Sequence, residues 1–325
     1  MNIVAAVVLL VAGLLILWKG ADVLVAGAVA LARQFGVSPL VIGLTVVAMG
    51  TSAPEVAASI AGVLREAGGG DLAVGNVFGS NIANLALVGG LVALIRPLKV
   101  QRKTIFREIP AMLAVALLLW PFIHNASMTR PEGLILLVVF AALILFMVHT
   151  AKKEARQTFS GAKNAGRDIE QAAPHTFKNV LFVILGLVGL AVGAKLAVDG
   201  AVVIGTRVGL SEAVIAITII AFGTSLPELV TCVVAAIKGH HDISVGNLVG
   251  SNIFNALLVT GAAGTVRPFE IASRRLAGGI DYWIMIVVSV LFTATVIIGK
   301  RVVGRTCGIL LLCVYIGYVA YLLFV

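Results

Sequence analysis

Two stretches of this chain repeat each other. Residues 36–55 read GVSPLVIGLTVVAMGTSAPE, and residues 209–228 read GLSEAVIAITIIAFGTSLPE. Each is an apolar run that ends in Gly-Thr-Ser, one further residue, a proline and a glutamate. A second matched pair follows, because residues 71–84 read DLAVGNVFGSNIAN and residues 242–255 read DISVGNLVGSNIFN. The chain is therefore built from two similar halves.

The composition places these halves in a membrane. Of the 325 residues, 60% are hydrophobic and only 12% are charged. A bilayer core about 30 Å thick takes roughly 20 apolar residues per helix, and apolar runs of that length recur from end to end. The net charge of +9 lies in short clusters between those runs. We therefore expect the partner to be a lipid bilayer and do not expect nucleic-acid binding.

Counting apolar runs between charge clusters predicts an all-α polytopic membrane protein with ten transmembrane helices. The predicted spans are 3–31, 37–63, 71–94, 106–122, 131–149, 177–205, 211–236, 243–264, 281–299 and 303–324. The polar stretch 151–175 is predicted to be a linker loop between residues 1–150 and residues 176–325. Because each half holds an odd number of spans, the second must enter the membrane from the opposite side. This predicts two inverted five-helix repeats.

The orientation follows from the positions of Lys and Arg. Basic residues concentrate between spans on one side, and they include Arg96, Lys99, Arg102, Lys103, Lys152, Lys153, Lys300 and Arg301. Positive charge marks cytoplasmic loops, so we predict a multi-pass inner-membrane protein with a cytoplasmic linker and both termini outside. Lys19 and Lys195 fall inside predicted spans. Each has an aspartate one turn away, Asp22 or Asp199, with which we expect it to pair unless it snorkels.

Glu55 and Glu228 are single carboxylates in the middle of apolar spans, where burial of a charge is costly. A proline precedes each one and leaves the carbonyl four residues earlier without its helical N–H partner. We therefore predict a broken helix in each half that presents carbonyl, hydroxyl and carboxylate oxygens at one depth, as hard cations prefer. The side chains concerned are Thr51, Ser52 and Glu55, and Thr224, Ser225 and Glu228.

Two polar stripes accompany the glutamates. In the third and eighth spans a polar side chain recurs every four positions, which places the set on one helix face. The stripes are Asn76, Ser80 and Asn84, and Asn247, Ser251 and Asn255. Asn81 and Asn252 point about 100° away from the serines, and we assign them to hydrogen bonds with neighbouring backbone. Interhelical packing stays open for Asn76 and Asn247, and for the other members we favour ion contact.

Charge counting narrows the ion. One Ca²⁺ would neutralise two glutamates, several Na⁺ ions could share the same oxygens, and Mg²⁺ gives up its water reluctantly. The cysteines, Cys232, Cys307 and Cys313, have no metal-type spacing and are interpreted as small core residues. Because no nucleotide-binding, phosphorylation or hydrolytic motif is present, we expect no cofactor and no enzymatic activity. An ion gradient would then supply the energy, and exchange is the simplest mechanism.

GTSAPE and GTSLPE, with GSNIAN and GSNIFN behind them, resemble the alpha-repeats of the sodium/calcium exchanger branch of the calcium/cation antiporter superfamily. The resemblance covers essentially the whole chain and is closest to the prokaryotic members. It implies a secondary active antiporter with Ca²⁺ and Na⁺ as substrates and no obligate protein partner. It also implies a ligand set of Glu55, Glu228, Thr51, Ser52, Thr224, Ser225, Ser80, Asn84, Ser251 and Asn255, with the backbone carbonyls of Ala48 and Ala221.

One position departs from some relatives. Asn255 stands where potassium-dependent exchangers have an aspartate, so the resemblance argues against potassium co-transport. The alternatives are an H⁺/Ca²⁺ antiporter, in which Glu55 or Glu228 takes up the proton, and a passive cation channel with no counterflow.

Overall fold

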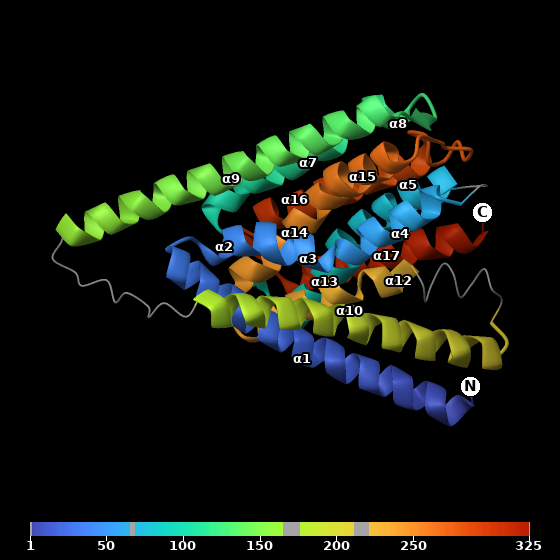
Figure 1. Ribbon diagram of the computed structural model, residues 1–325, viewed down its shortest axis with the longest axis horizontal. Helices are drawn as coiled ribbons and strands as arrows, with labels where there is room; N and C mark the ends of the chain where they lie inside the picture. Colours follow the sequence, from blue (N-terminus) through green and yellow to red (C-terminus); the bar gives the residue numbers. More distant parts are fainter. Residues whose placement is uncertain (1, 66–68, 165–175, 211–220, 325) are drawn as a thin grey trace.

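The computed structural model describes residues 2–65, 69–164, 176–210 and 221–324. Within these residues, eight helical segments are long and apolar enough to cross a membrane. They run side by side, and both termini lie at the same end of the bundle (Figure 1). The segments are α1 (Ile3–Phe35), α5–η2–α6 (Gly69–Ile82, Ala83–Val88, Gly89–Ile95), η3–α7–α8 (Thr104–Glu108, Ile109–Leu118, Trp120–Ile123), α9 (Arg130–Asn164), α10 (Thr176–Arg207), α14–η5–α15 (His241–Phe254, Asn255–Val259, Thr260–Val266), α16 (Ile280–Ile298) and α17 (Arg305–Phe324).

The predicted second span is a broken helix. It consists of α2 (Pro39–Ile42), the π-helical η1 (Gly43–Val47), α3 (Ala48–Thr51) and α4 (Ala53–Val63). The chain bends by 40° between α3 and α4, at Ser52, whose φ is −84° and ψ is 4°. Pro54 in the first turn of α4 supplies no N–H to the preceding turn. The break predicted from the proline is confirmed.

The predicted seventh span breaks in the same way. Its described part consists of α12 (Ala221–Thr224) and α13 (Leu226–Ile237). Ser225, between them, has φ of −86° and ψ of 1°, which nearly equals the conformation of Ser52. Pro227 lies in the first turn of α13, so this break is confirmed too. The earlier part of that span, residues 211–220, lies outside the described residues.

The predicted boundaries of the other spans fall within a few residues of the observed ones, except in the linker. Residues 151–175 were predicted to form a loop, which is wrong for residues 151–164. There α9 continues without interruption and extends beyond the neighbouring helices (Figure 1). The reason is local, because AKKEARQ consists of strong helix formers. The polar composition alone could not distinguish a loop from a helix.

Helices α1 and α10 run antiparallel and pack along their length (Figure 1). Glycines at seven-residue intervals allow the close approach: Gly13, Gly20 and Gly27 on α1, and Gly186, Gly193 and Gly200 on α10. A Cβ on Gly13 would lie 2.4 Å from the Ala197 backbone nitrogen, and one on Gly193 would lie 2.6 Å from the Leu17 nitrogen. Small residues at such an interface are a common way to bring membrane helices together.

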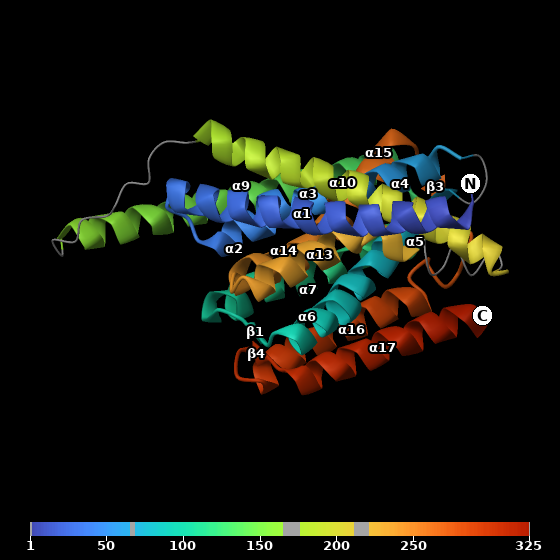
Figure 2. The same ribbon diagram turned by 90° about the horizontal axis from the view of Figure 1, so that it is seen from below.

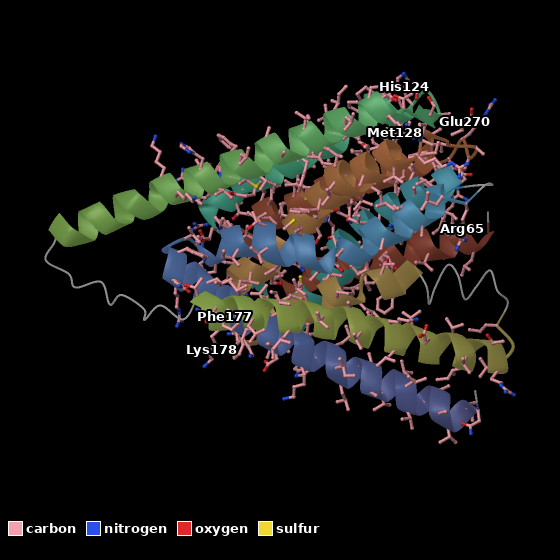
Figure 3. The ribbon with its side chains drawn as sticks, in the orientation of Figure 1. Arg65, His124, Met128, Phe177, Lys178 and Glu270 are labelled. Carbon is pink, nitrogen blue, oxygen red and sulfur yellow. The ribbon has the colours of Figure 1, made fainter. Side chains whose placement is uncertain are left out.

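Two short antiparallel ladders tie the halves to each other. β1 (Leu98–Lys99) pairs with β4 (Val302–Val303), and β2 (Ser127–Met128) pairs with β3 (Phe269–Glu270). Figure 2 shows β1 and β4 at the end of the molecule opposite the termini, and β3 at the end that holds them. Figure 3 likewise places His124 and Glu270 together near the termini, with Lys178 towards the opposite end.

The charged residues predicted inside spans have different partners. Lys195 Nζ lies 2.9 Å from Asp199 Oδ2, which confirms the expected pair on α10. On α1, however, Asp22 pairs with Lys238, at the end of α13, and not with Lys19. Lys19 itself is exposed. Of the two alternatives predicted for Lys19, its exposure therefore agrees with snorkelling, and Asp22 pairs instead with a basic residue from the other half, which sequence spacing did not reveal.

The packing of α1 on α10 leads to a stability prediction. Gly13→Val should lower the unfolding midpoint of the detergent-solubilised protein, because overpacking of this kind costs about 1–3 kcal/mol and the clashing atoms belong to backbone. The matched control is Gly317→Val on α17, where a Cβ would meet nothing within 4 Å. Thermal unfolding followed by tryptophan fluorescence measures both variants. Equal midpoints would contradict the close contact.

Candidate functional site

The two breaks bring the two glutamates into the middle of the bundle. Glu55 lies in the first turn of α4 and Glu228 in the first turn of α13. Their exposed fractions are 0% and 1%, and the carboxylates are close enough to repel each other. Among the described residues, no hydrogen-bond donor contacts either oxygen of Glu55 or Oε2 of Glu228. Within the described chain, no ion pair joins either buried carboxylate to a basic side chain.

The serine and threonine of the first break reach across to the second half. Ser52 Oγ donates to Glu228 Oε1 at 3.1 Å, and Thr51 Oγ1 lies 3.1 Å from Asn247 Oδ1. These two contacts join residues that are 176 and 196 positions apart in the chain. The hydroxyls of one repeat motif therefore line a site whose carboxylate comes from the other, which is how the halves share a single centre.

The serine and asparagine stripes contribute further buried polar side chains. Ser80 contributes to the electrostatic environment of Glu55, and each stripe residue favoured for ion contact is buried: Ser80, Asn84, Ser251 and Asn255. Within the described chain, both polar atoms of the Asn84 and Asn255 side chains, and the hydroxyl of Ser251, have no hydrogen-bond partner. Buried amides and hydroxyls are almost always paired, so these unpaired polar atoms are candidates for contact with a bound ligand.

Asn84 and Asn255 share a backbone feature that the sequence did not predict. Asn84 lies in η2 and Asn255 begins η5, and both segments are π-helical. A π-helical turn inserts one extra residue and rotates the following side chains, and such turns are frequent at functional sites. The same distortion thus occurs at the matching asparagine of each half.

Asn76 and Asn247 have protein partners instead. Asn76 Nδ2 donates to the Glu55 carbonyl at 3.1 Å and to Ser59 Oγ at 2.9 Å. Asn247 Nδ2 contacts Cys232 Sγ at 3.3 Å, while its Oδ1 accepts from Thr51. Both amides thus hold neighbouring helices around the glutamates. This agrees with the interhelical packing role that the sequence left open for Asn76 and Asn247.

The assignment of the remaining asparagines to backbone contacts is confirmed. Asn252 Nδ2 donates to the Leu248 carbonyl at 2.8 Å, and Asn81 Nδ2 reaches the Asn252 carbonyl at 3.5 Å. The second of these contacts joins the third and eighth predicted spans.

Four further members of the expected ligand set are Ala48, Ala221, Ser225 and Thr224. The Ala48 carbonyl accepts the Ser52 N–H at 3.0 Å and the Thr51 hydroxyl at 3.3 Å, so it can serve a cation only if the hydroxyl turns away. Ala221 begins α12 at the edge of the described residues. Ser225 is buried and its hydroxyl has no partner among the described residues. Thr224, beside it, lines a hollow next to the breaks.

Sequence reasoning missed three buried neighbours. Ser59 accepts from Asn76, Cys232 contacts Asn247, and Thr231 is fully buried beside Glu228 on α13. Ser59 lies four residues after Glu55, and Thr231 lies three after Glu228. A polar residue one turn beyond each glutamate on the same face was the available signal.

The arrangement suits a hard cation. The side-chain atoms that could bind a cation here are carboxylate, hydroxyl and amide oxygens. The described residues hold no cluster of three or more His, Cys, Asp or Glu side chains that would favour a transition metal. Two buried, mutually repelling carboxylates carry a large desolvation cost. A cation between them would supply the missing partner, and Ca²⁺ and Na⁺ accept irregular oxygen cages more readily than Mg²⁺ does.

The sequence profile of the family described as sodium/calcium exchanger protein matches residues 5–149 and 178–324, which is nearly the whole chain. The chain belongs to the sodium/calcium exchanger family. It is thus a multi-span membrane protein of an antiporter family, as the two repeat motifs predicted. The unmatched segment between the two ranges contains the described end of α9.

Individual relatives agree with the family assignment. The chain is 39% identical to the inner membrane protein YrbG of Escherichia coli over 98% of this chain and 96% of the relative. It is 31% identical to the sodium/calcium exchanger MaX1 of Methanosarcina acetivorans over 98% of each. A solved structure of the sodium-calcium exchanger NCX_Mj superimposes with a TM-score of 0.81 at 30% identity, covering 98% of this chain and 99% of the other.

The unpaired carboxylates lead to a binding prediction. At a Ca²⁺ concentration about 100-fold above its dissociation constant, binding to the native state alone stabilises a protein by about 2.7 kcal/mol. We expect Ca²⁺ to raise the unfolding midpoint of the wild-type chain in detergent and to leave Glu55→Gln and Glu228→Gln unshifted. Glu270→Gln, which removes an exposed carboxylate from β3, is the control and should respond as wild type. A Ca²⁺ response retained by both site variants would contradict the site.

Proposed function

We propose that this chain is a secondary active antiporter that exchanges Ca²⁺ for Na⁺ by alternating access. The observation that carries the proposal is the facing pair of buried carboxylates, Glu55 and Glu228, with orphaned neutral oxygens around them. A charge of about −2 in a water-poor centre is neutralised by one Ca²⁺, and several Na⁺ ions can occupy the same oxygens. Competition between the two ions at one site is the physical basis of exchange.

The proposed ligand set is the one expected from the sequence. It comprises the carboxylates of Glu55 and Glu228, the side-chain oxygens of Thr51, Ser52, Thr224, Ser225, Ser80, Asn84, Ser251 and Asn255, and the carbonyls of Ala48 and Ala221. The proximity of Ser52 to Glu228 and of Ser80 to Glu55 supports it. Asn76, Asn247, Ser59 and Cys232 would hold these ligands in place.

The proposed architecture is ten helices in two inverted five-helix repeats, residues 1–150 and 176–325. The opposite directions of α1 and α10, the equal breaks at Ser52 and Ser225, and the ladders that pair each half with the other support it. We place the chain in the inner membrane with both termini outside and residues 151–175 cytoplasmic. The basic residues at the end opposite the termini support that orientation.

Alternating access requires a part that can move against the site. A hollow of about 630 Å³ separates α10 from the two breaks and is lined by Thr51, Pro54, Thr224 and Pro227, among others. Its lining reaches both breaks but neither glutamate side chain. The tightly packed pair α1–α10 could slide along this hollow as one body and so uncover the site first to one side and then to the other.

The coupling ion can be tested with imposed gradients. Proteoliposomes loaded with Na⁺ should take up radiolabelled Ca²⁺ when diluted into Na⁺-free buffer, and a pH gradient alone should not drive uptake. Glu55→Gln and Glu228→Gln should transport no more than empty liposomes while still inserting, because removing a charge from a span eases insertion. Uptake driven by the pH gradient and not by sodium would favour the H⁺/Ca²⁺ alternative.

A passive channel is distinguished by counterflow. In a carrier, unlabelled Ca²⁺ inside the liposomes should accelerate entry of labelled Ca²⁺, because the loaded site returns faster than the empty one. A channel has no such dependence, so an unchanged rate of entry would argue against exchange.

A further inference from the structure

A groove at the end of the molecule opposite the termini has no role in the ion site. It has a volume of about 510 Å³ and lies between the start of η3 and the end of α16. Its lining residues are Arg102, Ile105 and Phe106 on one side and Ile297 and Arg301 on the other. The adjoining ladder of β1 and β4 fixes the two sides relative to each other (Figure 2).

The groove combines exposed apolar walls with positive charge. Phe106 is 73% exposed and Ile297 is 59% exposed, as expected of side chains that face lipid. Both arginines are exposed, and the Arg102 guanidinium lies 5.7 Å from the centre of the Phe106 ring. Within the described residues, neither guanidinium has a carboxylate at ion-pair distance. Their charges are therefore available to a ligand.

The opposite end of the molecule provides an internal comparison. There, Ile271 N donates to the Ala126 carbonyl at 2.9 Å, just as Val100 N donates to the Arg301 carbonyl at 2.8 Å. Ala126 precedes β2 with a φ of 60°, and Arg301 precedes β4 with a φ of 74°. The same unusual backbone thus forms around an alanine. The ladder therefore does not require an arginine at this position, although positive charge at this end also agrees with the predicted cytoplasmic orientation.

Arg102 also has a counterpart at the opposite end that is not an arginine. Arg102 lies three residues after β1, and the residue three after β3 is Ser273. Where one end carries two arginines, the other carries a serine and an alanine at matching places. Because both ends share a backbone, the charge difference is a property of this groove and not of the fold.

We propose that this groove binds an anionic phospholipid, with its phosphate between Arg102 and Arg301 and an acyl chain on Phe106 and Ile297. Guanidinium groups match phosphate oxygens in a bidentate geometry, and basic pockets between helices at the membrane surface are typical headgroup sites. The apolar walls favour a lipid over a free phosphate, since a free anion would leave them uncovered. Arg102 lies just before η3 and Arg301 lies in the turn between α16 and β4, so one lipid would bridge the two sides that the ladder joins.

Native mass spectrometry of the purified chain tests this with phosphatidylglycerol and phosphatidylcholine as probes. Wild type should retain phosphatidylglycerol in preference to phosphatidylcholine. The double variant R102S/R301A, which installs the residues of the opposite end, should bind phosphatidylglycerol at least about fivefold more weakly. Its control is K152Q/K153Q, which removes the same charge from exposed positions on α9 and should bind as wild type.

Three results would overturn the proposal. The first is equal phosphatidylglycerol binding by R102S/R301A and wild type. The second is an equal loss in both double variants, which would indicate general charge attraction. The third is displacement of the lipid by inorganic phosphate, which would indicate a free-anion site. Unfolding midpoints in phosphatidylcholine micelles check that the variants fold, and the single variants R102S and R301A replace the double variant if it does not.

Discussion

The main constraint on this structure is the free-energy cost of burying two carboxylates in a membrane interior. Glu55 and Glu228 are buried, near each other, and without a basic partner in the described part of the chain. In a medium of low polarity this arrangement is strongly unfavourable unless a cation joins it. The surrounding features serve that pair: prolines break the helices so that the glutamates begin new ones, and Ser52 and Thr51 cross to the other half. The site therefore exists only where the two halves meet.

The way the halves meet also links the site to movement. α1 and α10 contact each other through backbone at glycines spaced by seven, so the pair can behave as one body. Its other contacts include the ion pair between Asp22 and Lys238, which ties α1 to the end of α13. An ion pair on one side of the membrane can break and re-form, whereas the glycine contacts cannot be loosened without opening a gap. The alternating-access proposal therefore treats α1 and α10 as one body that moves against the rest.

Much of this could be predicted from the sequence because its signals are local. Apolar runs predicted the spans, and Pro54 and Pro227 predicted the breaks in two of them. The spacing of Asn81 and Asn252 gave their separate role. What could not be predicted depends on distant residues or on subtle backbone geometry. Thr51 meets Asn247 and Asp22 meets Lys238 only after folding, and the π-helical turns at Asn84 and Asn255 have no composition signal. The helical end of α9 was missed because polarity does not separate loops from exposed helices.

The position of a bound ion tests most directly whether Glu55 and Glu228 bind one cation together. Crystals of the chain soaked with Sr²⁺, a Ca²⁺ substitute with a strong anomalous signal, would show where the cation lies. We predict one dominant anomalous peak between Glu55 and Glu228, with oxygens of both carboxylates at about 2.3–2.6 Å, as for Ca²⁺. A peak that contacts only one carboxylate, or that lies outside the two breaks, would contradict this prediction.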